Sequence, residues 1–141
     1  MMADPYDLAR FVEAQEPVYA DVVDELRAGR KRSHWMWFIF PQLRDLGRSP
    51  AAKHYGIGSR DEAVAYLAHD VLGPRIRECA RLVAAAPGGS AERVMGQVDA
   101  LKLRSSMTLF AAVADDDRDF VAVLERFYDG ERDPLTVELL G

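Results

Sequence analysis

The 141-residue sequence contains one cysteine and three histidines, and these small numbers exclude several kinds of site. The single Cys79 cannot form an internal disulfide, and it rules out a cysteine-rich zinc site. His34, His54 and His69 are too far apart along the chain for the paired spacing of a helical zinc site. We therefore expect neither a metal nor a cofactor.

A long apolar run is also missing. The longest dense stretch, Trp35 to Phe40, is six residues long, whereas a membrane-spanning helix needs about 20. The N-terminus has Asp4 and Pro5 where a signal peptide has a cationic start and an apolar stretch. Together with the lone cysteine, these absences predict a cytoplasmic protein that does not act in a membrane.

The net charge of −5 argues against non-specific nucleic-acid binding, but the charges are unevenly distributed. Residues 27–104 hold 14 of the 18 Lys and Arg residues and only 7 of the 23 Asp and Glu residues. The middle of the chain is therefore basic, and the two ends are acidic. Either the two parts pair with each other across the folded surface, or the basic part faces an anionic partner.

Apolar residues recur at helical spacing through most of the chain. Pro17 and Gly29 mark the start and end of one helix, and Ser59 with Glu62 forms the capping box of another. N-cap residues precede three later helices: Ser90, Asp99 and Asp133. The sequence predicts an all-α protein, a compact orthogonal bundle of short helices that forms a single domain over residues 1–141.

Residues 33–43 form the most unusual segment, and they contain both tryptophans of the chain. The stretch from Trp35 to Phe40 has the composition of a strand, but it is equally typical of a buried helical turn that Pro41 ends. A single strand cannot form a sheet, so the prediction of an all-α fold does not depend on this choice.

The same segment supplies one set of candidate ligand-binding side chains: His34, Trp35, Trp37 and Gln42. An indole can stack on a flat ring, and a histidine titrates near neutral pH, which makes His34 the candidate catalytic residue. Four cations immediately before this segment, Arg27 to Arg32, could attract a phosphate. The alternatives are an aromatic core segment and a solvated basic helix end.

Residues 99–110 supply a second set of candidates: Lys102, Ser105, Ser106 and Thr108. With a helix that begins at Asp99, a lysine and hydroxyl groups near free backbone N–H groups would form an anion-binding site. Alternatively, the hydroxyls bond back to the preceding helical turn. A weaker third candidate is His69 with Asp70 at a helix junction, where the histidine acts as a base or as a pH-sensitive cap.

These segments resemble a bacterial family catalogued as domain of unknown function 1810, and the resemblance covers roughly residues 5–140. It is carried by residues 33–43, Tyr55-Gly56-Ile57, Glu62-Ala63 with Tyr66-Leu67, Leu72-Gly73-Pro74-Arg75, and Asp99 with residues 102–110. The resemblance implies a mainly helical single domain, and it implies no reaction. The chain is also similar in a general way to helical proteins that process ADP-ribose linkages.

Two hypotheses on function follow. In the first, residues 33–43 and 99–110 line one cleft that binds, and possibly turns over, a small anionic ligand such as a nucleotide or an ADP-ribose-like metabolite. In the second, the aromatic residues belong to the core, and the chain is a protein-interaction module with no catalytic activity. Nucleic-acid binding through Arg27 to Arg32 is the least favoured partner hypothesis.

Overall fold

The computed structural model describes residues 4–141, and within them the protein is all-α, as predicted. Residues 1–3, which the predicted domain includes, lie outside the described part. The ten α-helices and one 3-10 helix of these residues are α1 (Ala9–Gln15), α2 (Tyr19–Ala28), α3 (Met36–Ile39), η1 (Arg44–Leu46), α4 (Pro50–His54), α5 (Arg60–Ala68), α6 (Leu72–Ala85), α7 (Ala91–Met95), α8 (Gln97–Val113), α9 (Arg118–Tyr128) and α10 (Pro134–Leu140). None of the helices described is both long and apolar enough to span a membrane.

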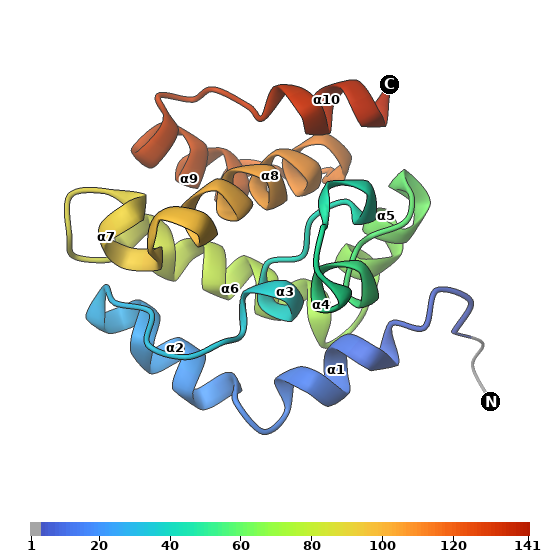
Figure 1. Cartoon of the computed structure of the whole chain (residues 1–141), viewed down its shortest axis with the longest axis horizontal. Helices are drawn as coiled ribbons and strands as arrows, with labels where there is room; N and C mark the ends of the chain where they lie inside the picture. Colours follow the sequence, from blue (N-terminus) through green and yellow to red (C-terminus); the bar gives the residue numbers. More distant parts are fainter. Residues whose placement is uncertain (1–3) are drawn as a thin grey trace.

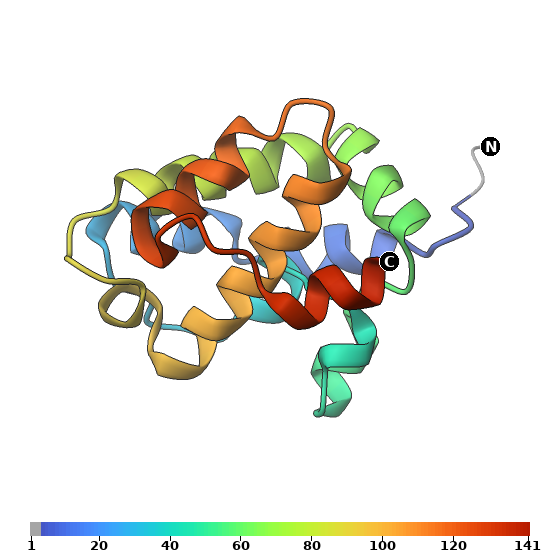
Figure 2. The same cartoon turned by 90° about the horizontal axis from the view of Figure 1, so that it is seen from above.

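The two longest helices, α6 and α8, run through the middle of the bundle, and α9 packs against both. In Figure 1, α8, α9 and α10 form the upper side of the molecule, and α1 and α2 form the lower side. The view from above shows that α10 lies beside α8 and that α4 stands off from the body of the bundle (Figure 2). The loops between the helices are short, as expected within one domain.

A chain of aromatic rings connects four helices through the core. Phe11 of α1 contacts Tyr66 of α5 edge-on, with ring centroids 5.1 Å apart. Tyr66 lies 5.2 Å from Phe110 of α8, which in turn lies 5.9 Å from Phe120 of α9. All four side chains are fully buried, so these contacts join the first third of the chain to the last.

The helix signals in the sequence act as predicted at several ends. Ser59 and Ser90 accept hydrogen bonds from the N–H groups of the third helical residue, and Asp133 caps α10 in the same way. Gly29 ends α2 in the left-handed region, with φ of 72°. Residues 36–39 form a helical turn, not a strand, because this segment has no partner strand.

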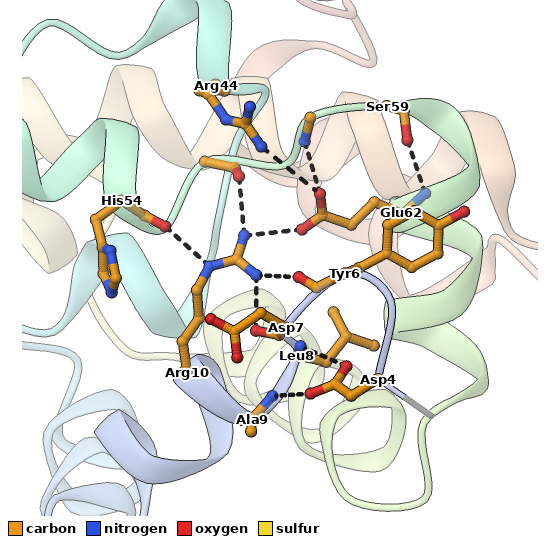
Figure 3. A network of polar contacts seen from close by, with 12 residues as sticks. Asp4, Tyr6, Asp7, Leu8, Ala9, Arg10, Arg44, His54, Ser59 and Glu62 are labelled. Atoms are coloured by element: carbon orange, nitrogen blue, oxygen red, sulfur yellow. Dashed lines mark hydrogen bonds and ion pairs between the residues drawn. The ribbon is translucent and has the colours of Figure 1, made fainter. Parts of the chain in front are cut away.

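A buried ion pair between Arg10 and Glu62 joins α1 to α5 (Figure 3). The two side chains are 10% and 4% exposed, and their charged atoms are 2.8 Å apart. The Arg10 guanidinium also donates to four backbone carbonyls, those of Tyr6, Asp7, His54 and Gly56. It therefore fixes the turn after α4 against the N-terminal helix.

Candidate functional site

An open groove lies between the η1–α4 segment, the first half of α8 and the start of α10. We name it the α4–α8 groove, and its volume is about 410 Å³, within the usual range of small-molecule sites. It is lined by Gln42, Leu46, Gly47, Arg48, Ser49, Ala52, Val98, Leu101, Lys102, Ser105, Asp133 and Leu135. The structure thus brings parts of the two predicted segments to one cavity, through Gln42 from the first and Lys102 and Ser105 from the second.

A much smaller cavity continues the groove toward the core. This inner recess, of about 10 Å³, is lined by Met36, Trp37, Phe40, Gln42, Ala52, Tyr55 and Lys102. Because Gln42, Ala52 and Lys102 line both cavities, the recess is the inner end of the groove. Its volume is about that of one water molecule or one ligand atom.

Helix α8 forms one wall of the groove through a stripe of residues separate from its core face. Val98, Leu101, Lys102 and Ser105 follow the i, i+3, i+4, i+7 spacing of a single helix face. Val98 and Leu101 are 66% and 69% exposed, whereas the core-facing Leu103 is fully buried. The wall is therefore an apolar surface that carries one ammonium group and one hydroxyl group.

The opposite wall is held in place by backbone pairing. Leu43 and Ile57 form an isolated parallel bridge, in which Ile57 N–H donates to the Gln42 carbonyl at 2.9 Å and Arg44 N–H donates to the Ile57 carbonyl at 2.8 Å. The bridge fixes Gln42 at the junction of groove and recess. Gly47 also lies close to α4, because a Cβ atom there would be 2.9 Å from the Ala52 Cβ.

Lys102 is the central charge of the site. Its Nζ lies 5.3 Å from the centroid of the Trp37 ring and 3.8 Å from Asp99 Oδ1. The other oxygen of Asp99 pairs with Lys31 Nζ at 2.9 Å, so two lysines share one carboxylate. This arrangement leaves a net positive charge beside the recess.

The lining of the groove as a whole carries one net positive charge. Arg48 is exposed on the α4 side, and it adds a second cation to the lining. The carboxylate of the lining, Asp133, accepts hydrogen bonds from the backbone N–H and the hydroxyl of Thr136. With two cations and one carboxylate in its lining, the groove is suited to an anion rather than a cation.

Two predicted residues of the first segment lie outside the groove. Trp35 is 1% exposed, and its Nε1 donates to Glu25 Oε1 at 3.0 Å, so its indole belongs to the core and cannot stack on a ligand. His34 is exposed and is not among the groove or recess residues. Trp35 is therefore not a ligand-binding residue. His34 does not line this cleft, so it cannot act there as the predicted catalytic residue.

The carboxylate of Glu25 organises the turn that leads into this segment. It accepts hydrogen bonds from the backbone N–H groups of Arg32 and Ser33, from the Ser33 hydroxyl and from Trp35 Nε1. Partial burial raises the pKa of Glu25, but these hydrogen bonds outweigh burial and lower it to about 2. The orientation of Trp35 is thus set by structure and not by a ligand.

The predicted anion site at a helix N-terminus is wrong for the second segment. Helix α8 begins at Gln97, directly after Gly96, so Asp99 lies within the first turn and does not cap it. Lys102 and Ser105 are consequently beyond the four free N–H groups of the helix. Ser105 and Thr108 donate to the carbonyls of the preceding turn, and the Thr108 hydroxyl also accepts from the backbone N–H of Asp133.

Thr108 is fully buried and fully bonded, and we withdraw it as a ligand-binding residue. Ser106 is also fully buried and lines neither cavity, yet its hydroxyl oxygen has no hydrogen-bond partner. Within residues 4–141, the other buried side-chain polar atom without a partner is Trp37 Nε1. Such atoms are rare, and both fall within the two predicted segments.

The remaining candidates lie away from the groove, and His69 and Asp70 line a separate open cavity of about 640 Å³ beside α1 and α5. His69 Nδ1 accepts from the N–H groups of Val71 and Leu72, and it therefore acts as a cap at the start of α6. The run from Arg27 to Arg32 is exposed apart from Lys31, which pairs with Asp99. Over the part of the chain that the structure describes, no three His, Cys, Asp or Glu side chains are grouped to hold a metal ion.

Sequence reasoning missed the apolar half of the groove: Leu46, Val98, Leu101 and Leu135. A signal was present for Val98 and Leu101, which share a helix face with Lys102 and Ser105 instead of following the core stripe. No local pattern marks Arg48 and Ser49, because they are placed by the turn between η1 and α4.

The fold and the groove define a small all-α protein with an open, apolar and cationic cavity. Comparison of the sequence with family models shows which family it represents. The chain belongs to the family described as "Protein of unknown function (DUF1810)", whose model matches residues 5–140. No curated protein matches the chain.

Among solved structures, the chain is similar to the conserved hypothetical protein Rv1873 from Mycobacterium tuberculosis, for which a crystal structure is known. The two are 61% identical, with a TM-score of 0.95. The similarity covers 97% of this chain and 98% of that one, so the two proteins share the complete helical fold.

Proposed function

We propose that the protein binds a small anionic ligand in the α4–α8 groove, of the size and charge of a nucleotide or an ADP-ribose-like metabolite. The observation that carries the proposal is the meeting of Gln42, Arg48 and Lys102 on the walls of one largely apolar cavity. Small-molecule sites combine an apolar lining with a few converging polar groups in this way.

The charges of the lining support an anion in particular. Arg48 and Lys102 are cations, whereas the carboxylate of Asp133 is bonded within its own helix cap. The apolar side chains of Leu46, Leu101 and Leu135 offer a surface for a flat ring or an aliphatic body. Both parts of such a ligand would therefore find a complementary surface.

The experiment is a thermal-shift series with AMP, ADP-ribose and phosphorylated metabolites at millimolar concentration. A ligand present at 100 times its dissociation constant should add about 2.7 kcal/mol to the free energy of unfolding. Lys102→Met should abolish this gain because it removes the ammonium group beside the recess. Lys53→Met is the matched control, since Lys53 is an exposed lysine of α4 that lines neither the groove nor the recess.

Two results would count against the proposal. One is an unfolding temperature that no anionic ligand raises. The other is a ligand-induced rise of the unfolding temperature that is equally large in Lys102→Met and in Lys53→Met. This result would place binding elsewhere on the molecule.

A protein-interaction module is the second candidate function. It is favoured by the exposure of apolar side chains along α8 and α10, of which Leu101 and Leu135 are 69% and 58% exposed. Leu101→Asp should then abolish capture of a partner, and the thermal shifts with small anions should be absent. Sedimentation of the wild type and of this variant with the captured partner separates the two candidates.

The proposal places the protein in the cytoplasm, and it leaves open whether a bound ligand is also turned over. The cytoplasmic location is supported by the single Cys79, which is fully buried. Burial raises the pKa of the Cys79 thiol to about 12, so this thiol is a structural group rather than a nucleophile.

A further inference from the structure

One residue that lines the inner recess carries an unmatched hydrogen-bond donor. Trp37 lines the recess, and its Nε1 is buried without a hydrogen-bond partner. A buried donor without a partner destabilises a protein, so its presence in a residue that lines a cavity requires a reason. An indole N–H can only donate, and the group that would satisfy it must therefore be an acceptor.

The neighbours of Trp37 restrict the kind of acceptor. Lys102 Nζ lies over the face of the indole ring at 5.3 Å, and an ammonium group has no lone pair with which to accept the N–H. It does, however, favour a negative charge close to the ring. Gln42 adds an amide that can donate from the wall shared by the recess and the groove.

Size restricts the ligand further. The recess of about 10 Å³ has room for one oxygen atom, whereas the groove of about 410 Å³ has room for the body of a small molecule. The apolar side chains line the groove, and Trp37, the residue that carries the unmatched donor, lines the recess at its inner end. The groove is therefore suited to the apolar body of a ligand, and the recess is suited to a small acceptor group at its end.

We infer that the recess binds one oxygen of a terminal anionic group, a carboxylate or a phosphate, which accepts the Trp37 N–H while the apolar body of the ligand lies against Leu101 and Leu135. The inference rests on the proposed function and defines its substrate class as a small acid with an apolar body. It assigns Trp37 the role of recognising the acid.

The test uses three probes with the same phenyl body: 3-phenylpropionate, its neutral amide 3-phenylpropionamide, and phenyl phosphate. The readout is the ¹⁵N–¹H spectrum of the full chain, which shows two indole N–H signals because the chain has two tryptophans. The Trp37 signal should move on addition of the acid. The Trp35 signal should stay in place, because its N–H is already bonded to Glu25.

The acid should bind at least about tenfold more tightly than the amide, because hydrogen bonds to a charged group are the stronger ones. Trp37→Phe keeps an aromatic ring at the position and removes the N–H. It should weaken acid binding by about tenfold and amide binding by less, because the amide carbonyl accepts only a neutral hydrogen bond. The same variant assigns the Trp37 signal, since that signal disappears. Phenyl phosphate compared with the carboxylate shows which acid the recess prefers.

Failure of this inference differs from failure of the proposed function. If the acid shifts the backbone signals of Leu101 and Lys102 but leaves the Trp37 indole signal in place, the groove binds and the inference is overturned. Equal affinities for acid and amide overturn it as well. If none of these probes, AMP or ADP-ribose shifts any groove signal, the proposed function itself fails.

Discussion

Single polar side chains determine how the two tryptophans differ. Trp35 and Trp37 are two positions apart on one helical turn, and the sequence alone treats them alike. Glu25, from another helix, bonds the indole of Trp35 and draws it into the core. Because this contact spans ten residues and depends on the end of α2, no local pattern could have separated the structural tryptophan from the one beside the groove.

The first prediction concerns the pH dependence that Glu25 introduces. Its pKa is about 2 in the folded chain against an ordinary value of 4.5, so its stabilising effect is complete above about pH 4.5 and is lost as the pH falls toward 2. Glu25→Gln should destabilise the protein by about 1–2 kcal/mol at pH 7. Urea unfolding at pH 3 and pH 7, followed by tryptophan fluorescence, checks this, and a variant with the same acid-induced loss as wild type would contradict it.

The second prediction concerns Arg10. Arg10→Met leaves the buried carboxylate of Glu62 with the hydrogen bond from Gly58 N–H and a 4.0 Å contact to the exposed Arg44 guanidinium. It should lower the free energy of unfolding by about 3 kcal/mol. Arg118→Met is the control, because its ion pair with Asp116 is exposed to solvent and should contribute nothing measurable. Equal urea midpoints for the two variants would show that the network of Figure 3 does not stabilise the fold.

At the scale of elements, the sequence predicted most helices and several of their caps because these depend on neighbouring residues. The start of α8 was misjudged because Gly96, which ends α7, is also the residue from which α8 begins. The N-cap of α8 is Gly96, three residues before the predicted Asp99, so Asp99 lies in the first turn, where it pairs with Lys31 and Lys102. The groove was not predictable as a whole, since its walls come from three elements that meet only in the folded chain.

The third prediction concerns the close approach of the turn after α4 to η1. A Cβ atom at Gly56 would lie 2.4 Å from the Arg44 Cα and 3.0 Å from the Ala52 carbonyl oxygen. Gly56→Ala should therefore force the backbone apart and destabilise the protein by about 1–3 kcal/mol. Gly89→Ala is the control, because a Cβ there meets no atom within 4 Å. Chemical denaturation of both variants measures the difference, and equal stabilities would show that the contact can relax.

At the scale of the whole molecule, pairing within the fold accounts for part of the charge asymmetry of the sequence. Arg75 pairs with Glu16, Arg81 pairs with Asp119, and the backbone carbonyls of residues 131 and 132 accept from Arg104. These contacts join the basic middle of the chain to its acidic ends, and they involve a minority of the 14 basic residues of that part. The groove cations Arg48 and Lys102 lie apart from these pairs.

The fourth prediction follows from this pairing. The pairs are partly exposed, so each contributes little and all are weakened by salt. Raising NaCl to about 1 M should lower the free energy of unfolding by no more than about 1–2 kcal/mol. Thermal unfolding in a salt series checks this. A much larger loss would mean that the surface charges, and not the aromatic core, supply most of the stability.

The bridge between Leu43 and Ile57 has a consequence for how this fold can diversify. The chain leaves the helical body at one point and returns to it at the same point, after an excursion that carries η1, the turn at Arg48 and α4 (Figure 2). An insertion or a substitution of residues between Leu43 and Ile57 would change one side of the cavity. The bridge would still hold the two ends of the replaced segment together. The shape of this cavity can therefore be changed by replacing a short surface module, without repacking the interior.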